Sequence, residues 1–331
     1  EPHFCNSFLF SIAFKHKLKG KWSRNAGSMT AVSGLGPMIT ALAPNPDKTT
    51  SPIYLLPRCP SQQGDAARDW RVPIQAPSQM WLVHAGNAFQ YSENGKRLKI
   101  QMHASCCSYN WFSFQRMFGY DWRRDQLDPS VMNPTEGGDQ LLPFIVKISV
   151  ELDECGNCGR CDAERLKQWS KTADFPVINP AYSGRKNTYT YAASASGTRP
   201  TLPYFPFDTI VKLDDGGKSA ETWYAAPRRF IGEPVFVPKE NGEEDDGYLV
   251  VVEASATMIL NLTISCWGMT ILFIVAWQYA VAVPRCYLVI LDPKTMKLVT
   301  RVEVPRRLIF PIGFHGFWCR ENVSPCFQNL N

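Results

Sequence analysis

The 331-residue sequence lacks the short motifs by which many enzymes are identified. It has no Gly-x-Ser-x-Gly elbow, no Gly-x-x-x-x-Gly-Lys-Ser/Thr phosphate loop and no His-Glu-x-x-His pair, so the usual hydrolase and nucleotide-binding classes lose their support. No run of five basic residues occurs, and the net charge is only +5. A nucleic-acid partner is therefore not expected.

Regular cysteine spacing is also absent. The 11 cysteines are odd in number and suggest no disulfide framework, which favours a reducing compartment. Three of them, Cys155, Cys158 and Cys161, have the spacing of metal ligands. A closed zinc site requires a fourth ligand, and no further Cys or His follows nearby. We interpret this stretch as a reduced surface loop, with a zinc module as the alternative.

Residues that interrupt helices are plentiful, with 25 Pro and 22 Gly, and together with 12% aromatic residues they predict many short strands. The clearest hairpin joins residues 287–291 to residues 297–304. An all-β fold follows, and composition leaves a propeller, a barrel or a sandwich open. The acidic run 243–246 is predicted to be a solvated turn. Further strand-like runs are 53–58, 96–104, 144–152, 187–193, 209–213, 221–224 and 248–252.

Charge is absent from one long segment, residues 254–283, which is long enough to cross a bilayer as a helix. Removal of residues 254–278 would join the strand-like runs 249–253 and 279–283. We therefore interpret residues 254–278 as a foreign insert or a retained intron. The alternative is a non-catalytic β protein with a single membrane anchor at residues 254–283.

Only five histidines are present, and two of them, His84 and His315, lie among apolar and small residues. Such a histidine can be a satisfied core residue. Alternatively, neutral imidazoles from distant strands bind a transition metal and are oriented by carboxylates. Asp174 and Glu233 are the candidate carboxylates because each stands beside a strand-like run, where a partner would explain an acidic side chain. The alternative is that each is an exposed loop residue.

Around these residues the sequence resembles the carotenoid cleavage dioxygenase family, and specifically its plant-type members. The resemblance covers most of residues 37–318 and consists of several blocks in family order. These blocks are Pro37-Met-Ile-Thr-Ala-Leu42, Pro52-Ile-Tyr-Leu-Leu-Pro-Arg58, His84-Ala-Gly-Asn87, Ser108-Tyr-Asn-Trp-Phe112, Phe118-Gly-Tyr-Asp-Trp122, Gly232-Glu-Pro234 and Gly313-Phe-His-Gly316.

The resemblance implies a seven-bladed β-propeller that holds non-haem Fe(II) on its axis through four histidines. His84 corresponds to the third ligand and His315 to the fourth. Glu233 corresponds to the acidic partner of His315, and Asp174 stands where many relatives carry the Glu partner of the third ligand. His3 is the candidate second ligand, and the first is expected upstream of the chain.

Residues 1–331 are accordingly expected to be the C-terminal portion of a single carotenoid oxygenase domain whose N-terminal blades are missing and which residues 254–278 interrupt. Such a fragment is expected to hold little iron and to be inactive alone.

The implied reaction is the cleavage of a carotenoid or apocarotenoid double bond with O2, which gives two carbonyl products. A long apolar substrate requires an apolar tunnel, for which the candidates are Trp111, Phe112, Phe317 and Trp318. The family also implies a plastid location and peripheral contact with a membrane, without a spanning helix.

Overall fold

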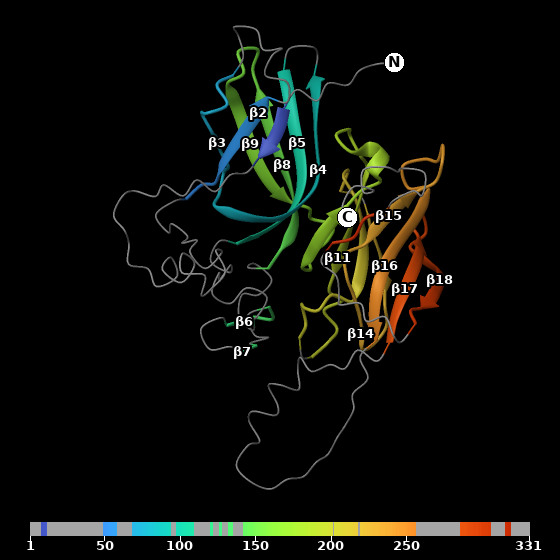
Figure 1. Cartoon of the computed structure of the whole chain (residues 1–331). Helices are drawn as coiled ribbons and strands as arrows, with labels where there is room; N and C mark the ends of the chain where they lie inside the picture. The colour runs from blue at the N-terminus through green and yellow to red at the C-terminus, as the bar shows by residue number, and fades with distance from the viewer. Residues whose placement is uncertain are drawn as a thin grey trace, which may run out of the picture.

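The computed structural model describes residues 8–11, 49–57, 68–93, 97–108, 120–121, 126–127, 132–134, 142–200, 202–217, 219–255, 285–305 and 315–318. Within these ranges every element is a β-strand except one short 3-10 helix, η5 (Pro180–Tyr182) (Figure 1). The predicted all-β fold is therefore confirmed.

Three antiparallel sheets, here called blades A, B and C, contain most of the strands (Figure 1). Blade A consists of β4 (Met80–Glu93), β5 (Arg97–Ser108), β8 (Phe144–Leu152) and β9 (Cys158–Arg165). Blade B consists of β10 (Ala173–Val177), β11 (Tyr189–Ser194), β12 (Thr209–Asp214) and β13 (Ala220–Tyr224). Blade C consists of β14 (Arg229–Ile231), β15 (Val235–Pro238), β16 (Gly247–Ser255), β17 (Arg285–Asp292) and β18 (Lys297–Glu303).

Two smaller sheets complete the described strands. The first contains β1 (Phe8–Ser11), β2 (Pro52–Pro57) and β3 (Ile74–Gln75), and the second contains β6 (Tyr120–Asp121) and β7 (Gln126–Leu127). Most of the predicted strands are found. The run 144–152 coincides with β8, and the predicted hairpin at 287–304 is formed by β17 and β18.

Within blades A and B, strands that follow one another in the sequence are also neighbours in the sheet, as in a propeller. The first strand of each of these blades therefore forms one edge, and the edge strands β4 and β10 contact each other. Blades of a propeller surround a central channel. His84 lies on β4 and Asp174 on β10, whereas Glu233 lies between β14 and β15 of blade C.

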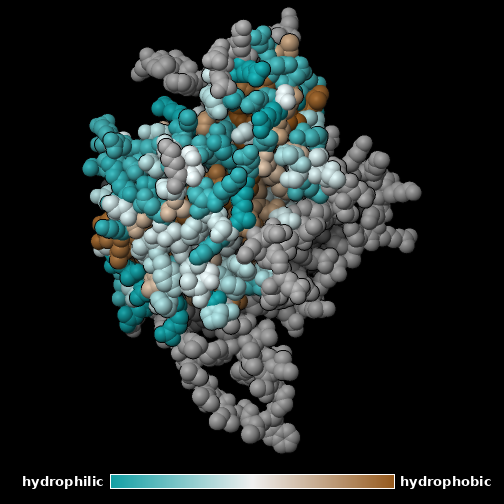
Figure 2. Space-filling view, turned by 180° about the vertical axis from the view of Figure 1, so that it is seen from behind, coloured by the Kyte–Doolittle hydropathy of each residue, from teal (hydrophilic) through white to brown (hydrophobic). Residues whose placement is uncertain are grey.

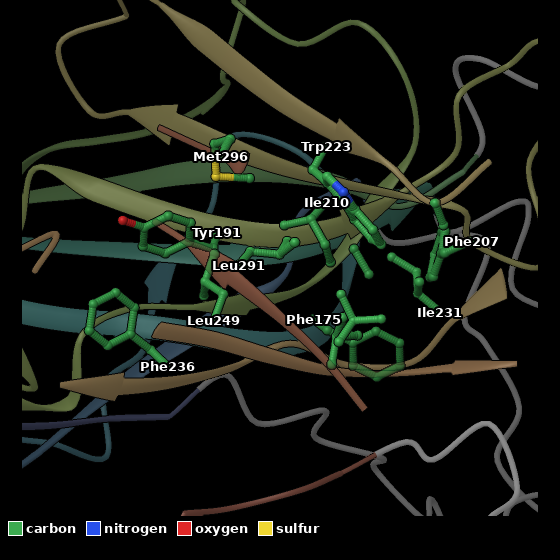
Figure 3. Packing of buried hydrophobic residues seen from close by; sticks show 14 of the residues in the cluster. Phe175, Tyr191, Phe207, Ile210, Trp223, Ile231, Phe236, Leu249, Leu291 and Met296 are labelled. Atoms are coloured by element: carbon green, nitrogen blue, oxygen red, sulfur yellow. The ribbon is translucent and has the colours of Figure 1, made fainter. Parts of the chain in front are cut away.

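Apolar clusters hold the blades together. Blade A packs onto β2 and β3 through Ile53 and Leu55, and a smaller cluster around Val211 joins blades A and B. The third cluster lies between blades B and C, where the rings of Tyr191 and Phe236 approach to 5.5 Å (Figure 3). On the face shown in Figure 2, most of the coloured surface is hydrophilic and hydrophobic side chains are scattered.

The acidic run 243–246 forms the predicted turn, and Glu243 is exposed, but two of its other carboxylates are not simply solvated. The Glu244 carboxylate accepts hydrogen bonds from the backbone N–H groups of Thr188 (2.6 Å) and Tyr189 (2.7 Å), and Asp245 pairs with Lys212 at 3.0 Å. The prediction of a fully solvated turn was wrong only for Glu244 and Asp245, because backbone donors and a lysine of blade B lie within their reach. The turn links blades B and C.

A buried polar cluster joins blades A and B. Asp215, in the turn between β12 and β13, bonds to Nε2 of His103 (2.8 Å) and Nζ of Lys147 (3.0 Å) from blade A. His103 is completely buried. Burial alone would raise the pKa of Asp215, but the hydrogen bonds and charges of His103 and Lys147 outweigh burial and hold this pKa well below its usual range.

We expect Asp215→Asn to lower the free energy of unfolding by about 1–3 kcal/mol at neutral pH, because Lys147 and His103 lose a charged partner. A carboxyl with a depressed folded pKa stabilises the fold above its unfolded pKa of about 3.9, and this contribution is lost as pH falls through the folded value. The difference between wild type and variant in urea unfolding should therefore shrink below about pH 4.

The control is Asp162→Asn, which removes an exposed pair with Arg160. Surface pairs of this kind contribute little. An effect of Asp215→Asn no larger than that of Asp162→Asn, or one that does not change with pH, would contradict the prediction.

Most of the uncharged segment 254–283 lies, in the sequence, between two strands of blade C that pair with each other. β16 and β17 are antiparallel neighbours, and their last pair is Ser255 opposite Arg285. Ala254 and Ser255 thus belong to β16, although they begin the segment interpreted as an insert. Residues 256–284 lie outside the described residues. Within the described ranges, no helix is long and apolar enough to cross a membrane.

The pairing of Ser255 with Arg285 leads to a prediction for residues 256–278. Their deletion leaves residues 279–284 as a six-residue connection between two strands that already pair. The deletion variant should unfold cooperatively and be more stable by about 1 kcal/mol, because a shorter connection loses less chain entropy on closure. Thermal unfolding measures this.

A second deletion, of residues 254–278, places Tyr279 and Ala280 where Ala254 and Ser255 stand in β16, and tests the same boundary two residues earlier. If either deletion abolishes cooperative unfolding, the removed residues are part of the fold rather than an insert.

Candidate metal centre

His84 lies on β4 between two irregularities in the pairing of β4 with β5. The register shifts once between Leu82 and His84 and again between Ala85 and Asn87. Such β-bulges bend a strand and redirect its side chains, and they are common next to functional sites. The local backbone of β4 therefore directs His84 away from the regular alternation of the strand.

Gly86 allows β4 to approach β10 closely. A Cβ atom at this position would lie 2.9 Å from Cβ of Pro176 and 3.2 Å from the carbonyl oxygen of His103. Real Cβ atoms are essentially never found this close to another carbon. A glycine is therefore required where β4 crosses β10, and this close contact brings His84 to Asp174.

His84 and Asp174 form a direct contact, with Nδ1 of His84 2.8 Å from Oδ1 of Asp174. The same carboxylate oxygen accepts the backbone N–H of Phe175 at 2.8 Å. Burial lowers the pKa of His84, but the hydrogen bond to Asp174 and the charges of Asp174 and Glu233 outweigh burial, so that the pKa is raised. The Asp side chain is thus long enough to reach the imidazole.

His315 has the corresponding arrangement with Glu233, which lies between β14 and β15. Nδ1 of His315 is 3.3 Å from Oε2 of Glu233, and the same oxygen accepts the backbone N–H of Gly316 at 3.1 Å. The backbone contact fixes the chain beside His315. The Glu233 side chain is mostly buried, whereas that of His315 is exposed.

The two imidazoles lie together although more than two hundred positions separate them in the sequence. Their ring centroids are 5.2 Å apart, and the ring planes are inclined by 77°. Because Nδ1 of each ring faces a carboxylate, Nε2 carries the free lone pair when the ring is neutral, which is the form in which histidine binds a metal. The residues thus fit a transition-metal site.

The remaining predicted site residues divide into two groups. His3, Trp111 and Phe112 lie outside the described residues. Phe317 and Trp318 are exposed, and they line a cavity of about 230 Å³ with Val235 and other aliphatic residues of blade C beside His315. Across the described ranges, no group of three or more His, Cys, Asp or Glu side chains has a metal-binding arrangement.

The cysteine-rich stretch offers little to a metal. Cys155 is exposed, whereas Cys158 and Cys161 lie on β9 and pack against the apolar cluster of blade A. Burial raises the pKa of Cys161 to about 11 and also raises that of Cys158, which disfavours the thiolate form that binds metals. The zinc alternative therefore lacks support.

Sequence reasoning assigned no role to Asn87, which fixes the segment after η5 against β4. Its Nδ2 donates to the carbonyl of Arg185 (2.9 Å) and to Oδ1 of Asn187 (2.8 Å), and its Oδ1 accepts the backbone N–H of Gly184 (3.0 Å). Its only signal in the sequence is its place in the block His84-Ala-Gly-Asn87.

Comparison with known proteins identifies the family of the chain. The profile of the family described as retinal pigment epithelial membrane protein, RPE65, matches residues 9–320. The chain belongs to this carotenoid oxygenase family. The family resemblance read from the sequence is confirmed.

Two curated relatives from plants are similar to most of the chain. Carotenoid cleavage dioxygenase 7, chloroplastic, from Arabidopsis thaliana is 50% identical, and the protein of the same name from Oryza sativa subsp. japonica is 47% identical. Each alignment covers 89% of this chain and 45% of the relative. The chain thus spans about half the length of the curated relatives it matches.

Solved structures of this family share the fold. A chimera of Synechocystis apocarotenoid oxygenase (ACO) and RPE65 matches 88% of this chain and 48% of its own with a TM-score of 0.57 at 21% identity. Cobalt-substituted Synechocystis ACO matches 84% of this chain and 46% of its own, with a TM-score of 0.54 at 21% identity. The expected β-propeller of the carotenoid oxygenase type is confirmed.

We expect Gly86→Ala to destabilise the chain by about 1–3 kcal/mol, because the added methyl group pushes β4 away from β10. Gly159→Ala on β9 is the matched control, since its added Cβ would meet no atom closer than 3.9 Å. Alanine there should leave stability unchanged or slightly raise it. Urea unfolding of both variants measures the difference, and equal effects would contradict the role assigned to Gly86.

Proposed function

We propose that this chain belongs to an Fe(II)-dependent dioxygenase that cleaves a double bond of a carotenoid or apocarotenoid with O2 and gives two carbonyl products. The meeting of His84 and His315, each with Nδ1 against a carboxylate, is the observation that carries the proposal. The names of the relatives support the reaction, since they are carotenoid cleavage dioxygenases and an apocarotenoid oxygenase.

His84 and His315 would hold the iron through Nε2, and His3 is the candidate for a further ligand. When bound, the iron supplies the means to activate O2. Asp174 and Glu233 hold the Nδ1 protons of the two imidazoles, which fixes the ring orientations and makes Nε2 more basic. Their negative charges also compensate the charge of a divalent cation.

The substrate proposal rests on the surroundings of His315. The cavity beside it is lined by aliphatic residues of β15, β16 and β17, including Val235, Val250 and Leu288, and by Phe317 and Trp318. Such a surface suits an apolar polyene rather than a polar metabolite. Trp111 and Phe112 are proposed as further tunnel residues by family resemblance.

A plastid location and peripheral contact with a membrane are also part of the proposal. The names of the plant relatives include the word chloroplastic. A substrate that dissolves in lipid must be taken up at a membrane surface. The alternative, a non-catalytic β protein with a membrane anchor at residues 254–283, leaves the two carboxylate-bound imidazoles without a role.

Titration with Co²⁺, followed by visible absorption, tests the metal pair. We expect His84→Ala and His315→Ala each to lower the affinity at least about tenfold, because each removes one of two converging ligands. Metal affinity reports on the imidazoles directly. Aerobic incubation of the Fe(II)-loaded chain with a carotenoid is the companion assay. Any carbonyl products that the wild type forms should decrease in the two variants that bind metal more weakly.

Cys158→Ser is the matched control, since it changes the candidate ligand of the alternative zinc module on β9, at the opposite edge of blade A from β4. It should leave Co²⁺ affinity unchanged. Loss of affinity in this variant would favour the zinc module, and wild-type affinity in His84→Ala would refute the proposed centre.

A further inference from the structure

Phe175 has an unusual backbone conformation next to a candidate site residue. It follows Asp174 on β10, and its φ angle is 53°, in the left-handed region that bulky residues rarely adopt. Such a conformation costs on the order of 1–3 kcal/mol and persists only where the surroundings enforce it. Phe175 is also buried, with 5% of its surface exposed.

The left-handed turn places Asp174 opposite His84. The backbone N–H of Phe175 donates to Oδ1 of Asp174 at 2.8 Å, and this oxygen is the one that contacts Nδ1 of His84. The pairing of β10 with β11 shifts register between Asp174 and Val177, so the irregular backbone is confined to this short stretch. The next residue, Pro176, packs against Gly86 of β4.

The aromatic ring of Phe175 contacts both imidazoles. Its centroid is 4.5 Å from that of His84, with the planes inclined by 32°, and 6.1 Å from that of His315, with the planes inclined by 84°. Behind these contacts, the ring meets Phe207 edge to face at 6.2 Å. Figure 3 shows Phe175 in the apolar cluster near Phe207 and Ile231. The ring therefore connects the core to the metal centre.

We propose that Phe175 is the positioning residue of the metal centre. Its left-handed backbone directs the Asp174 carboxylate to Nδ1 of His84, and its ring fixes the plane of His84 and the separation of the two imidazoles. The inference rests on the proposed function, because it assigns Phe175 to the same metal pair. Phe175 acts through the histidines and is not itself a catalytic residue.

A purely structural role would make Phe175 one core aromatic among several. Phe207 provides the comparison, because it belongs to the same cluster, is 6% exposed and contacts the Phe175 ring. The described contacts of Phe207 include no histidine ring. If Phe175 only fills space, leucine at either position should have the same consequences for His84.

The test uses four variants of the full chain: Phe175→Leu removes the ring, Phe175→Tyr retains it, Phe175→Gly removes it while relieving the backbone strain, and Phe207→Leu is the control. The first measurement needs no metal. Nitrogen NMR of ¹⁵N-labelled imidazoles, at a pH where they are neutral, reports which nitrogen of His84 carries the proton.

We expect the Nδ1–H tautomer of His84 in the wild type, in Phe175→Tyr and in Phe207→Leu. Phe175→Leu should show a mixture of tautomers, because leucine lacks the ring contacts that offset the left-handed strain, so the backbone relaxes and withdraws Asp174 from His84. Phe175→Gly tests the ring without left-handed strain, and it should retain the Nδ1–H tautomer while binding metal less tightly. It also gives a result if the leucine variant does not fold.

The second measurement is Co²⁺ titration. Phe175→Leu should bind about tenfold more weakly than the wild type and with an altered visible spectrum, whereas Phe175→Tyr and Phe207→Leu should be unchanged. Wild-type tautomer and affinity in Phe175→Leu, or equal losses in Phe207→Leu, would overturn the inference.

The two measurements also separate failure of this inference from failure of the proposed function. If Co²⁺ binding does not depend on His84, the proposed function fails, and the tautomer comparison of Phe175→Leu with Phe207→Leu still decides the role of Phe175.

Discussion

The close contact between β4 and β10 is the constraint on which the candidate centre depends. The absence of a side chain at Gly86 lets Pro176 lie against β4, and this brings a histidine of blade A within hydrogen-bonding distance of an aspartate of blade B. A methyl group at this point would separate the strands by enough to break a hydrogen bond whose geometry tolerates only a few tenths of an ångström. The packing of blades A and B therefore determines whether the imidazole of His84 has a carboxylate partner at Nδ1.

Several other contacts hold the blades in the relative positions that this geometry needs. Asp215 links blade B to His103 and Lys147 of blade A, and the Glu244 carboxylate links blade C to backbone donors of blade B. His103 is fully buried, and Asp215 and Glu244 are partly buried, so each would be costly to leave without a partner. Together with the apolar clusters between the blades, they make the mutual orientation of the first strands specific rather than adjustable.

In the histidine pair, the two carboxylates favour protonation of Nδ1, which leaves Nε2 of each neutral imidazole available to a metal. Each carboxylate favours the tautomer that leaves Nε2 free, and each is itself fixed by a backbone N–H group, from Phe175 for Asp174 and from Gly316 for Glu233. The same design is thus repeated on two blades. The strained backbone at Phe175 belongs to this design, since its N–H and its ring serve the same imidazole.

The sequence alone determined the all-β class, about half of the described strands and the hairpin at residues 287–304. The family resemblance implied the pairing of His84 with Asp174 and of His315 with Glu233. Strands and turns depend on neighbouring residues. His84, Glu233 and His315 lie in blocks that resemble one family, and Asp174 stands where many relatives carry a glutamate. Only the tertiary structure decided the bulges around His84, the left-handed Phe175 and the docking of the acidic turn at Glu244. The left-handed backbone of Phe175 is unfavourable for the residue itself, and no local sequence pattern marks the bulges or the contacts of Glu244. They become stable only when contacts between blades, which join residues far apart in the chain, offset the local cost.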